Sequence, residues 1–119
     1  TVKEVHGQYS IKNLQGRSIR MDILAHDSKN VIYNIEVQND DAGADPKRAR
    51  YNSSLLDANI TEAGDKYSQL KETYIIFITK NDVLGKGLPI YHIDRMIKET
   101  GEKFEDETHI IYVNSLIQK

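Results

Sequence analysis

The chain has 119 residues, of which 39% are hydrophobic and 29% are charged, and its formal net charge is −2 at neutral pH. This composition suits one globular domain and excludes a disordered chain, and no apolar run approaches the length of a membrane-spanning helix. Cysteine is absent, which excludes disulfides and leaves oxygen or imidazole as the ligands of any metal. Because the chain has no cysteine, a reducing, cytoplasmic setting is expected. The net charge lacks the basic excess of a protein that holds nucleic acid by charge alone.

The first expected element is a strand at residues 5–11, where apolar and polar residues alternate loosely before turn residues at 13–16. The chain begins at Thr1 without a methionine, and it lacks the basic and apolar pattern of a signal peptide. We therefore expect residues 1–119 to form a single domain that is a fragment of a longer protein.

A β-hairpin is predicted next. Residues 18–26 and 31–39 are rich in β-branched and aromatic side chains, and the segment between them, 27–30, has the composition of a turn. Along the second strand, the odd positions from Val31 to Val37 are apolar, and we expect this face to form the core.

The length of the hairpin loop decides which residues of the two strands are opposed. A three-residue loop ending at Asn30 needs a left-handed residue there, and asparagine tolerates that conformation. This register places Asp22 opposite Glu36. It also places Arg20 opposite Gln38, whereas a two-residue loop would break both pairs.

A helix is predicted from Pro46 to Ile60, because Asp45 suits the N-cap and proline suits the first helical position. Ala49, Leu56 and Ile60 form its apolar stripe, with Leu55 beside them. A short helical turn is expected through residues 67–70, and the rings of Tyr51 and Tyr67 are expected in the core. The first turns of the long helix carry three basic residues, Lys47, Arg48 and Arg50.

The remaining elements complete a mixed sheet. The apolar run at 73–79 predicts a central strand covered on both faces, and the residues at 80–89 predict a loop. A short strand at 90–93, a polar helical stretch at 95–101 and a strand at 109–113 follow. The order, strand-strand-strand-helix-strand with a mixed extension, indicates an α/β sandwich.

The opposed carboxylates are the feature of the hairpin that suggests chemistry. Asp22 and Glu36 would repel each other, and a bound cation would explain their placement. Hard cations such as Mg²⁺ or Mn²⁺ prefer such oxygen ligands. The alternative is that these residues form the solvated face of a hairpin. The histidines lack the spacing of zinc ligands and are expected at the surface or at strand ends: His6, His26, His92 and His109.

Several sequence blocks resemble a known family. The segments RMDILAHDSKNVIYNIEVQ, at residues 20–38, and KRARYNSSLLDANITEAGDKYSQLKETYIIFIT, at 47–79, are similar to the PD-(D/E)XK nuclease family transposases, also described as recombination-promoting nucleases. The likeness continues through Gly64-x-x-Tyr67-x-x-Leu70 and Gly85-x-Gly87-x-Pro89-x-Tyr91, and through the block IIYVN at 110–114, so it covers nearly the whole chain.

The resemblance implies a restriction-endonuclease-like fold, in which helices flank a mixed β-sheet, and metal-dependent hydrolysis of DNA phosphodiester bonds in transposition or recombination. Asp22 and Glu36 then correspond to the metal-binding acids, and the carbonyl of Val37 is a further expected ligand of Mg²⁺ or Mn²⁺. Gln38 stands where the wider superfamily usually has lysine, so it can orient water but supplies no positive charge. The candidate DNA contacts are Arg20, Lys47, Arg48 and Arg50, and a solvated first turn is the alternative for the last three.

Two other functions stay open at this point. A catalytically weak or inactive DNA-binding or assembly module with the nuclease fold is favoured by Gln38, by the acidic net charge and by the lack of a predicted N-terminal helix. In the superfamily such a helix usually supplies a further acidic residue. A structural domain of a larger host is the third function. DNA is the expected partner, no membrane contact is expected, and a homo-oligomer is compatible with the sequence.

Overall fold

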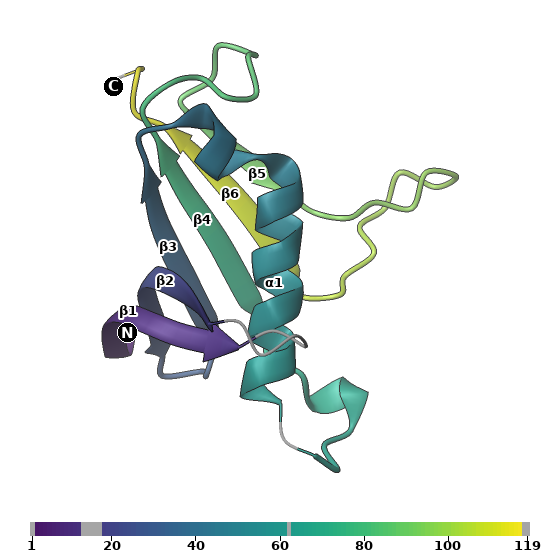
Figure 1. The fold of residues 1–119 in the computed structure, drawn as a ribbon. Coiled ribbons are helices and arrows are strands. Elements are labelled where there is room, and N and C mark those ends of the chain that lie inside the picture. Colours follow the sequence, from purple (N-terminus) through teal and green to yellow (C-terminus); the bar gives the residue numbers. More distant parts are fainter. Residues whose placement is uncertain (1, 13–17, 62, 118–119) are drawn as a thin grey trace.

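The computed structural model describes residues 2–12, 18–61 and 63–117, with side chains described from Leu24 onward apart from position 62. The chain forms a mixed sheet with one long helix against it (Figure 1). The elements in chain order are β1 (Val2–Lys12), β2 (Ser18–Asp27), β3 (Ile32–Gln38), the 3₁₀ helix η1 (Asp41–Ala44), α1 (Pro46–Ile60), the 3₁₀ helix η2 (Tyr67–Gln69), β4 (Thr73–Thr79), β5 (Ile90–Ile93) and β6 (Thr108–Asn114).

Within the described part of the chain, the sheet has six strands in the order β1-β2-β3-β4-β6-β5. Strands β3, β4 and β6 are parallel neighbours, whereas β1, β2 and β3 form antiparallel pairs and β5 runs antiparallel to β6. The predicted mixed α/β sheet and the central place of β4 are therefore confirmed. Parallel neighbours need a crossover connection, and α1 provides it between β3 and β4, which brings the helix across one face of the sheet (Figure 1).

The hairpin between β2 and β3 has the predicted three-residue loop. Asn30 has φ 63°, in the left-handed region, and the carboxylate of Asp27 accepts hydrogen bonds from the backbone N–H groups of Lys29 and Val31 at 2.8 and 3.1 Å. The ladder runs from His26 opposite Ile32 to Ile23 opposite Ile35, so the register is the one predicted. Two expected pairs lie beyond the last pair of this ladder: Asp22 with Glu36 and Arg20 with Gln38.

The buried face of β3 is the opposite of the one that was predicted. The even positions Ile32, Asn34 and Glu36 are buried beneath α1, whereas Val37 is 55% exposed. The prediction that the odd face forms the core is wrong, because the crossover helix covers the even face and no described helix covers the other. The expectation that β4 is covered on both faces is wrong for the same reason, since its alternate residues on the open face are only half-buried.

Helix α1 begins and ends at the predicted residues. The Asp45 carboxylate accepts a hydrogen bond from the Lys47 N–H at 2.8 Å, and Pro46 fills the first helical position. The buried face of α1 packs on Ile75, Phe77 and Tyr112 of the sheet with the side chains of Ala49, Leu55 and Leu56. None of the described helices is long and apolar enough to cross a membrane.

The polar helical stretch predicted at 95–101 is wrong. Residues 94–107 form an arm that leaves the sheet after β5 and projects away from it before the chain returns to β6 (Figure 1). The arm is held as an irregular hairpin in which Phe104 N–H donates to the carbonyl of Arg95 at 2.9 Å and Ile97 N–H donates to that of Glu102 at 2.8 Å. Because β5 and β6 are antiparallel neighbours, the chain must reverse between them, and Gly101, with φ 72°, permits the reversal.

Candidate active site

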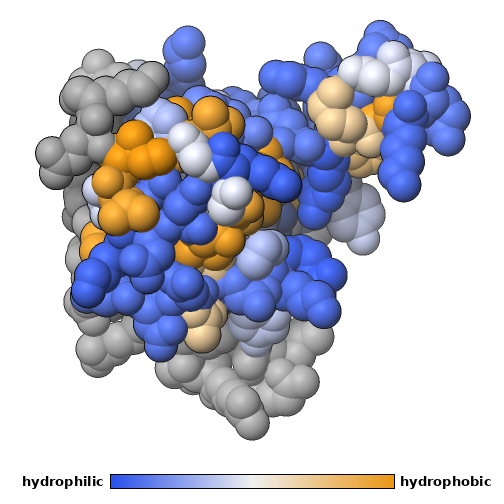
Figure 2. Space-filling model, turned by 90° about the horizontal axis from the view of Figure 1, so that it is seen from above, coloured by the Kyte–Doolittle hydropathy of each residue, from blue (hydrophilic) through white to orange (hydrophobic). Residues whose placement is uncertain are grey.

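The candidate site lies where the parallel strands β3 and β4 end and α1 begins. Glu36 and Gln38 lie on the helix-covered face of β3, and η1 follows directly after this strand. Figure 2 looks onto this end of the molecule, where polar residues in blue surround apolar patches in orange. Carboxyl ends of parallel strands are the usual place for functional groups in α/β sheets.

The carboxylate of Glu36 is almost fully buried, with 1% of the residue exposed. Its Oε2 accepts a hydrogen bond from Nδ2 of Asn34 at 3.0 Å, and its Oε1 lies 3.4 Å from Nη2 of Arg48. Taking a carboxylate out of water is unfavourable unless it is paired and hydrogen-bonded. The alternative that Glu36 belongs to a solvated hairpin face is therefore wrong.

Arg48 is the cation that faces this buried carboxylate. From the first turn of α1, its guanidinium donates to the carbonyl of Gly43 at 2.7 Å and lies 5.9 Å from the ring centroid of Phe77. The side chains of Lys47 and Arg50 are exposed on the same helix. Of the three basic residues of α1 that were predicted to contact DNA, Arg48 thus turns toward Glu36 while Lys47 and Arg50 face solvent.

Gln38 is held in a space that leaves no room for a side chain at Gly43. A Cβ atom at position 43 would lie 2.0 Å from Oε1 of Gln38 and 3.3 Å from Nη1 of Arg48. The Gln38 carbonyl accepts from Lys80 N–H at 3.1 Å, on the side of β4. Backbone groups of a strand alternate in direction, so the carbonyl of Val37 points toward the side of β2.

The remaining predicted ligand is Asp22, on β2 one position beyond the last ladder pair. The side chains of Asp22 and Arg20 lie outside the described residues. Among the side chains that are described, no three His, Cys, Asp or Glu residues gather as a metal-binding group. The donors present at this end, the Glu36 carboxylate, the Gln38 amide and the Val37 carbonyl, are the oxygen types that hard divalent cations prefer.

Tyr112 supports the site and was not predicted. It is buried with 2% exposed, and its hydroxyl donates to the carbonyl of Ala44 at 2.5 Å, which ties η1 to β6. Burial first, and the charge of Asp45 second, raise the pKa of Tyr112 to about 12. The two tyrosines expected in the core are instead exposed, Tyr51 by 44% and Tyr67 by 91%.

A mixed sheet with a crossover helix and a buried carboxylate near the ends of its central strands has the architecture of a nuclease-type α/β domain. The family model described as PD-(D/E)XK nuclease family transposase matches residues 3–116. The chain therefore belongs to this family. No curated protein and no solved structure matches the chain.

Proposed function

We propose that the protein is a metal-dependent DNA endonuclease that hydrolyses phosphodiester bonds in transposition or recombination. In this proposal Asp22, Glu36 and the carbonyl of Val37 hold Mg²⁺ or Mn²⁺. The observation that carries the proposal is the buried carboxylate of Glu36, in a chain that belongs to a nuclease family.

The setting of Glu36 favours a functional role over a structural one. An apolar residue would fill a core position under α1 without the cost of desolvating a charge. Glu36 instead keeps one oxygen toward Asn34 and the other toward Arg48. Buried ionisable groups at the ends of sheet strands are typical of sites that bind ions or substrates.

When bound, a divalent cation supplies positive charge that polarises the scissile phosphate and lowers the pKa of a water molecule. The chain's own groups have separate tasks in this proposal. The amide of Gln38 positions the water by hydrogen bonds, since an amide both donates and accepts. Lys47 and Arg50, exposed on α1, contact DNA phosphates, and Arg20 of β2 is a further contact.

The test is nicking of supercoiled plasmid by the full-length protein with Mg²⁺ or Mn²⁺. We expect Asp22→Ala and Glu36→Gln to abolish nicking while circular dichroism shows an unchanged fold. Glu99→Gln is the matched control, because Glu99 is exposed on the arm, far from the site. Wild-type nicking rates in both site variants would refute the assignment of the ligands.

A non-catalytic DNA-binding or assembly module is the second candidate, and one observation favours it. Arg48 already places a positive charge beside Glu36 at 3.4 Å, and Gln38 lacks the charge of the superfamily lysine. Calorimetric titration with Mg²⁺ and Mn²⁺ separates the two candidates. If the protein is a nuclease, we expect it to bind a cation and to lose this binding in the Glu36→Gln variant. If it is a non-catalytic module, we expect no metal binding, but the protein should still shift DNA in a gel.

A further inference from the structure

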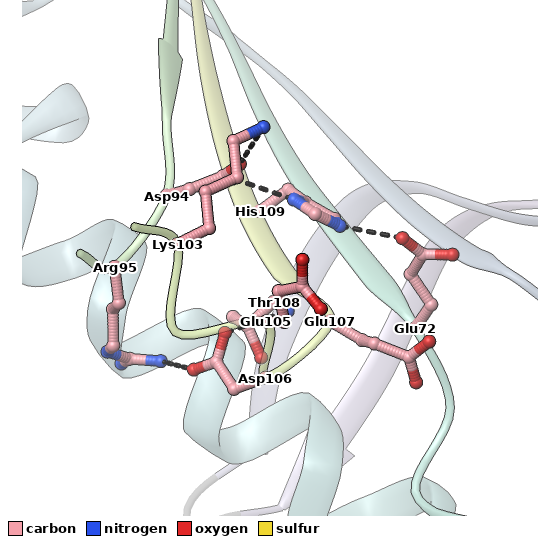
Figure 3. Close-up of a pocket in the computed structure, with 9 residues that line it drawn as sticks. All are labelled: Glu72, Asp94, Arg95, Lys103, Glu105, Asp106, Glu107, Thr108 and His109. Carbon is pink, nitrogen blue, oxygen red and sulfur yellow. Dashed lines mark hydrogen bonds and ion pairs between the residues drawn. The ribbon is translucent and has the colours of Figure 1, made fainter. Parts of the chain in front are cut away.

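A second cluster of charged residues lies at the other end of the sheet, where β4 and β6 begin and the arm joins the body (Figure 3). It surrounds a pocket of about 300 Å³. The cluster combines residues from three separate parts of the chain: Glu72 just before β4, Asp94 and Lys103 on the arm, and His109 on β6. The proposed nuclease site does not include it.

Both nitrogens of the His109 ring are hydrogen-bonded to carboxylates. Nδ1 lies 2.7 Å from Oδ1 of Asp94, and Nε2 lies 2.7 Å from Oε2 of Glu72 (Figure 3). An ionised carboxylate only accepts hydrogen bonds, so each of these contacts needs an N–H group on the ring. A neutral imidazole has one such group and an imidazolium has two. The geometry is therefore that of a positively charged histidine.

The aromatic neighbours of His109 form a row across the open face of the sheet. The ring of Tyr74 on β4 stacks on His109 with centroids 4.4 Å apart, and Tyr33 on β3 stacks on Tyr74 at 5.2 Å. The hydroxyl of Tyr33 donates to Asp27 at 3.0 Å. The row fixes the ring plane of His109, so that its two nitrogens point toward the two carboxylates.

The other charged and titratable groups around the ring come from the arm and from β5. Lys103 Nζ lies 3.2 Å from Oδ2 of Asp94, and Arg95 pairs with Asp106 at 2.5 Å. Glu105 and Glu107 line the same pocket, and His92 of β5 lines the space on the other side of His109. Carboxylates outnumber the cations in this set, which favours a proton on His109.

The arm depends on these polar contacts for its position. Its large apolar side chains are substantially exposed, Met96 by 51%, Ile97 by 39% and Phe104 by 61%. Figure 2 shows the arm standing apart with orange atoms at its surface. Asp94 is the first residue of the arm, and its contact with His109 fastens the arm to β6. Segments with few buried apolar contacts open at low free-energy cost.

We propose that His109 is a proton-operated clamp that holds the arm against the sheet. While the ring is an imidazolium, it bridges Glu72 and Asp94. Loss of one proton removes one of the two hydrogen bonds and leaves a carboxylate facing a nitrogen lone pair. The repulsion loosens the base of the arm, and the arm then samples a wider range of orientations.

The direction of the pH response follows from the surroundings of the ring. Burial lowers the pKa of His109, but the hydrogen bonds and charges of Asp94 and Glu72 outweigh this effect, so the pKa lies above its ordinary value. A group whose pKa is raised by folding stabilises the structure fully below its unfolded value, about 6.5 for histidine. The clamp is therefore closed at pH 6 and opens as the pH rises through the raised value.

The clamp can be tested by spin labelling, because the chain has no cysteine. Ser54→Cys on α1 and Lys98→Cys on the arm place labels at exposed positions. We expect a narrow distribution of label distances at pH 6 that broadens at higher pH. The midpoint of broadening should equal the pKa of His109 measured by NMR of its ring. His92→Gln, on neighbouring β5, is the matched control and should keep the wild-type response.

Two further variants test the clamp. His109→Gln should give a broad distribution at every pH, and Asp94→Asn should lower the ring pKa and shift the broadening by the same amount. If His109→Gln does not fold, Asp94→Asn still tests the clamp. A ring that titrates below pH 6.5, or a distance distribution that stays narrow through the titration of His109, overturns the clamp. None of these measurements depends on nuclease activity.

Discussion

Replacing Arg48 with methionine removes the cation beside Glu36 and keeps an apolar stem that can still cover Phe77. Glu36, only 1% exposed, then keeps the hydrogen bond from Asn34 but loses the guanidinium of Arg48. Breaking a fully buried ion pair in this way costs about 3–5 kcal/mol. Here the Arg48 side chain is 34% exposed and the separation is 3.4 Å, so we expect a smaller loss, about 2 kcal/mol of unfolding free energy.

Urea denaturation followed by circular dichroism measures this loss. In a chain of this size it corresponds to a fall in Tm of roughly 8 °C. A double-mutant cycle with Glu36→Gln isolates the pair, and Arg48→Met in the Glu36→Gln background should cost at least 1 kcal/mol less than in the wild type. The matched control is Arg50→Met, which removes an exposed cation from the same turn and should change stability by less than about 0.5 kcal/mol.

The pairing would be refuted by an Arg48→Met protein as stable as the Arg50→Met control. A coupling energy near zero in the cycle would refute it as well. If Glu36 binds a cation, Mg²⁺ should also restore part of the stability lost in Arg48→Met, because a ligand that binds only the folded state stabilises it. No rescue at saturating Mg²⁺ would count against the metal assignment and leave the ion pair itself unaffected.

Gly43→Ala should displace the amide of Gln38 and reduce the nicking rate at least tenfold. The free energy of unfolding in urea should change by about 1 kcal/mol or less, because the flexible side chain of Gln38 can move aside. An unchanged nicking rate would contradict the role of Gln38. Tyr112→Phe leaves the buried carbonyl of Ala44 without its donor and should cost about 1–3 kcal/mol in the same denaturation assay. Because the pKa of Tyr112 is raised to about 12, wild-type stability should fall as pH rises from about 10 to 12, and Tyr112→Phe should lack this phase. Asn30→Val forces a β-branched residue to φ 63° and should cost about 1–2 kcal/mol, whereas Asn30→Gly should match the wild type.

Local chemistry was sufficient to predict the elements whose ends are marked by particular residues. Asp45 and Pro46 marked the start of α1, and the structure begins the helix there. Asn30 marked a three-residue loop, and its left-handed backbone sets the register that was expected. These features depend on neighbours within a few residues, so the order of side chains contains the necessary information.

The arm could not be predicted in the same way. Its residues have a polar composition that is compatible with a helix, but between the antiparallel strands β5 and β6 they form a hairpin held by backbone hydrogen bonds. The contact between His109 and Glu72 spans 37 positions in the chain, and it forms because β4 and β6 begin side by side. Tyr112 reaches the carbonyl of Ala44 across 68 positions for a similar reason.

The sequence by itself determined that the chain builds a mixed α/β sheet, where its crossover helix lies, how its hairpin is registered and which family it resembles. Only the tertiary structure decided which face of β3 is buried. The even positions of this strand carry Ile32 together with the polar residues Asn34, Glu36 and Gln38. Alternation therefore favoured the odd face as the core, but it does not say which face a helix will cover. The crossover brought α1 over the even positions, which buried Glu36 and placed Arg48 beside it.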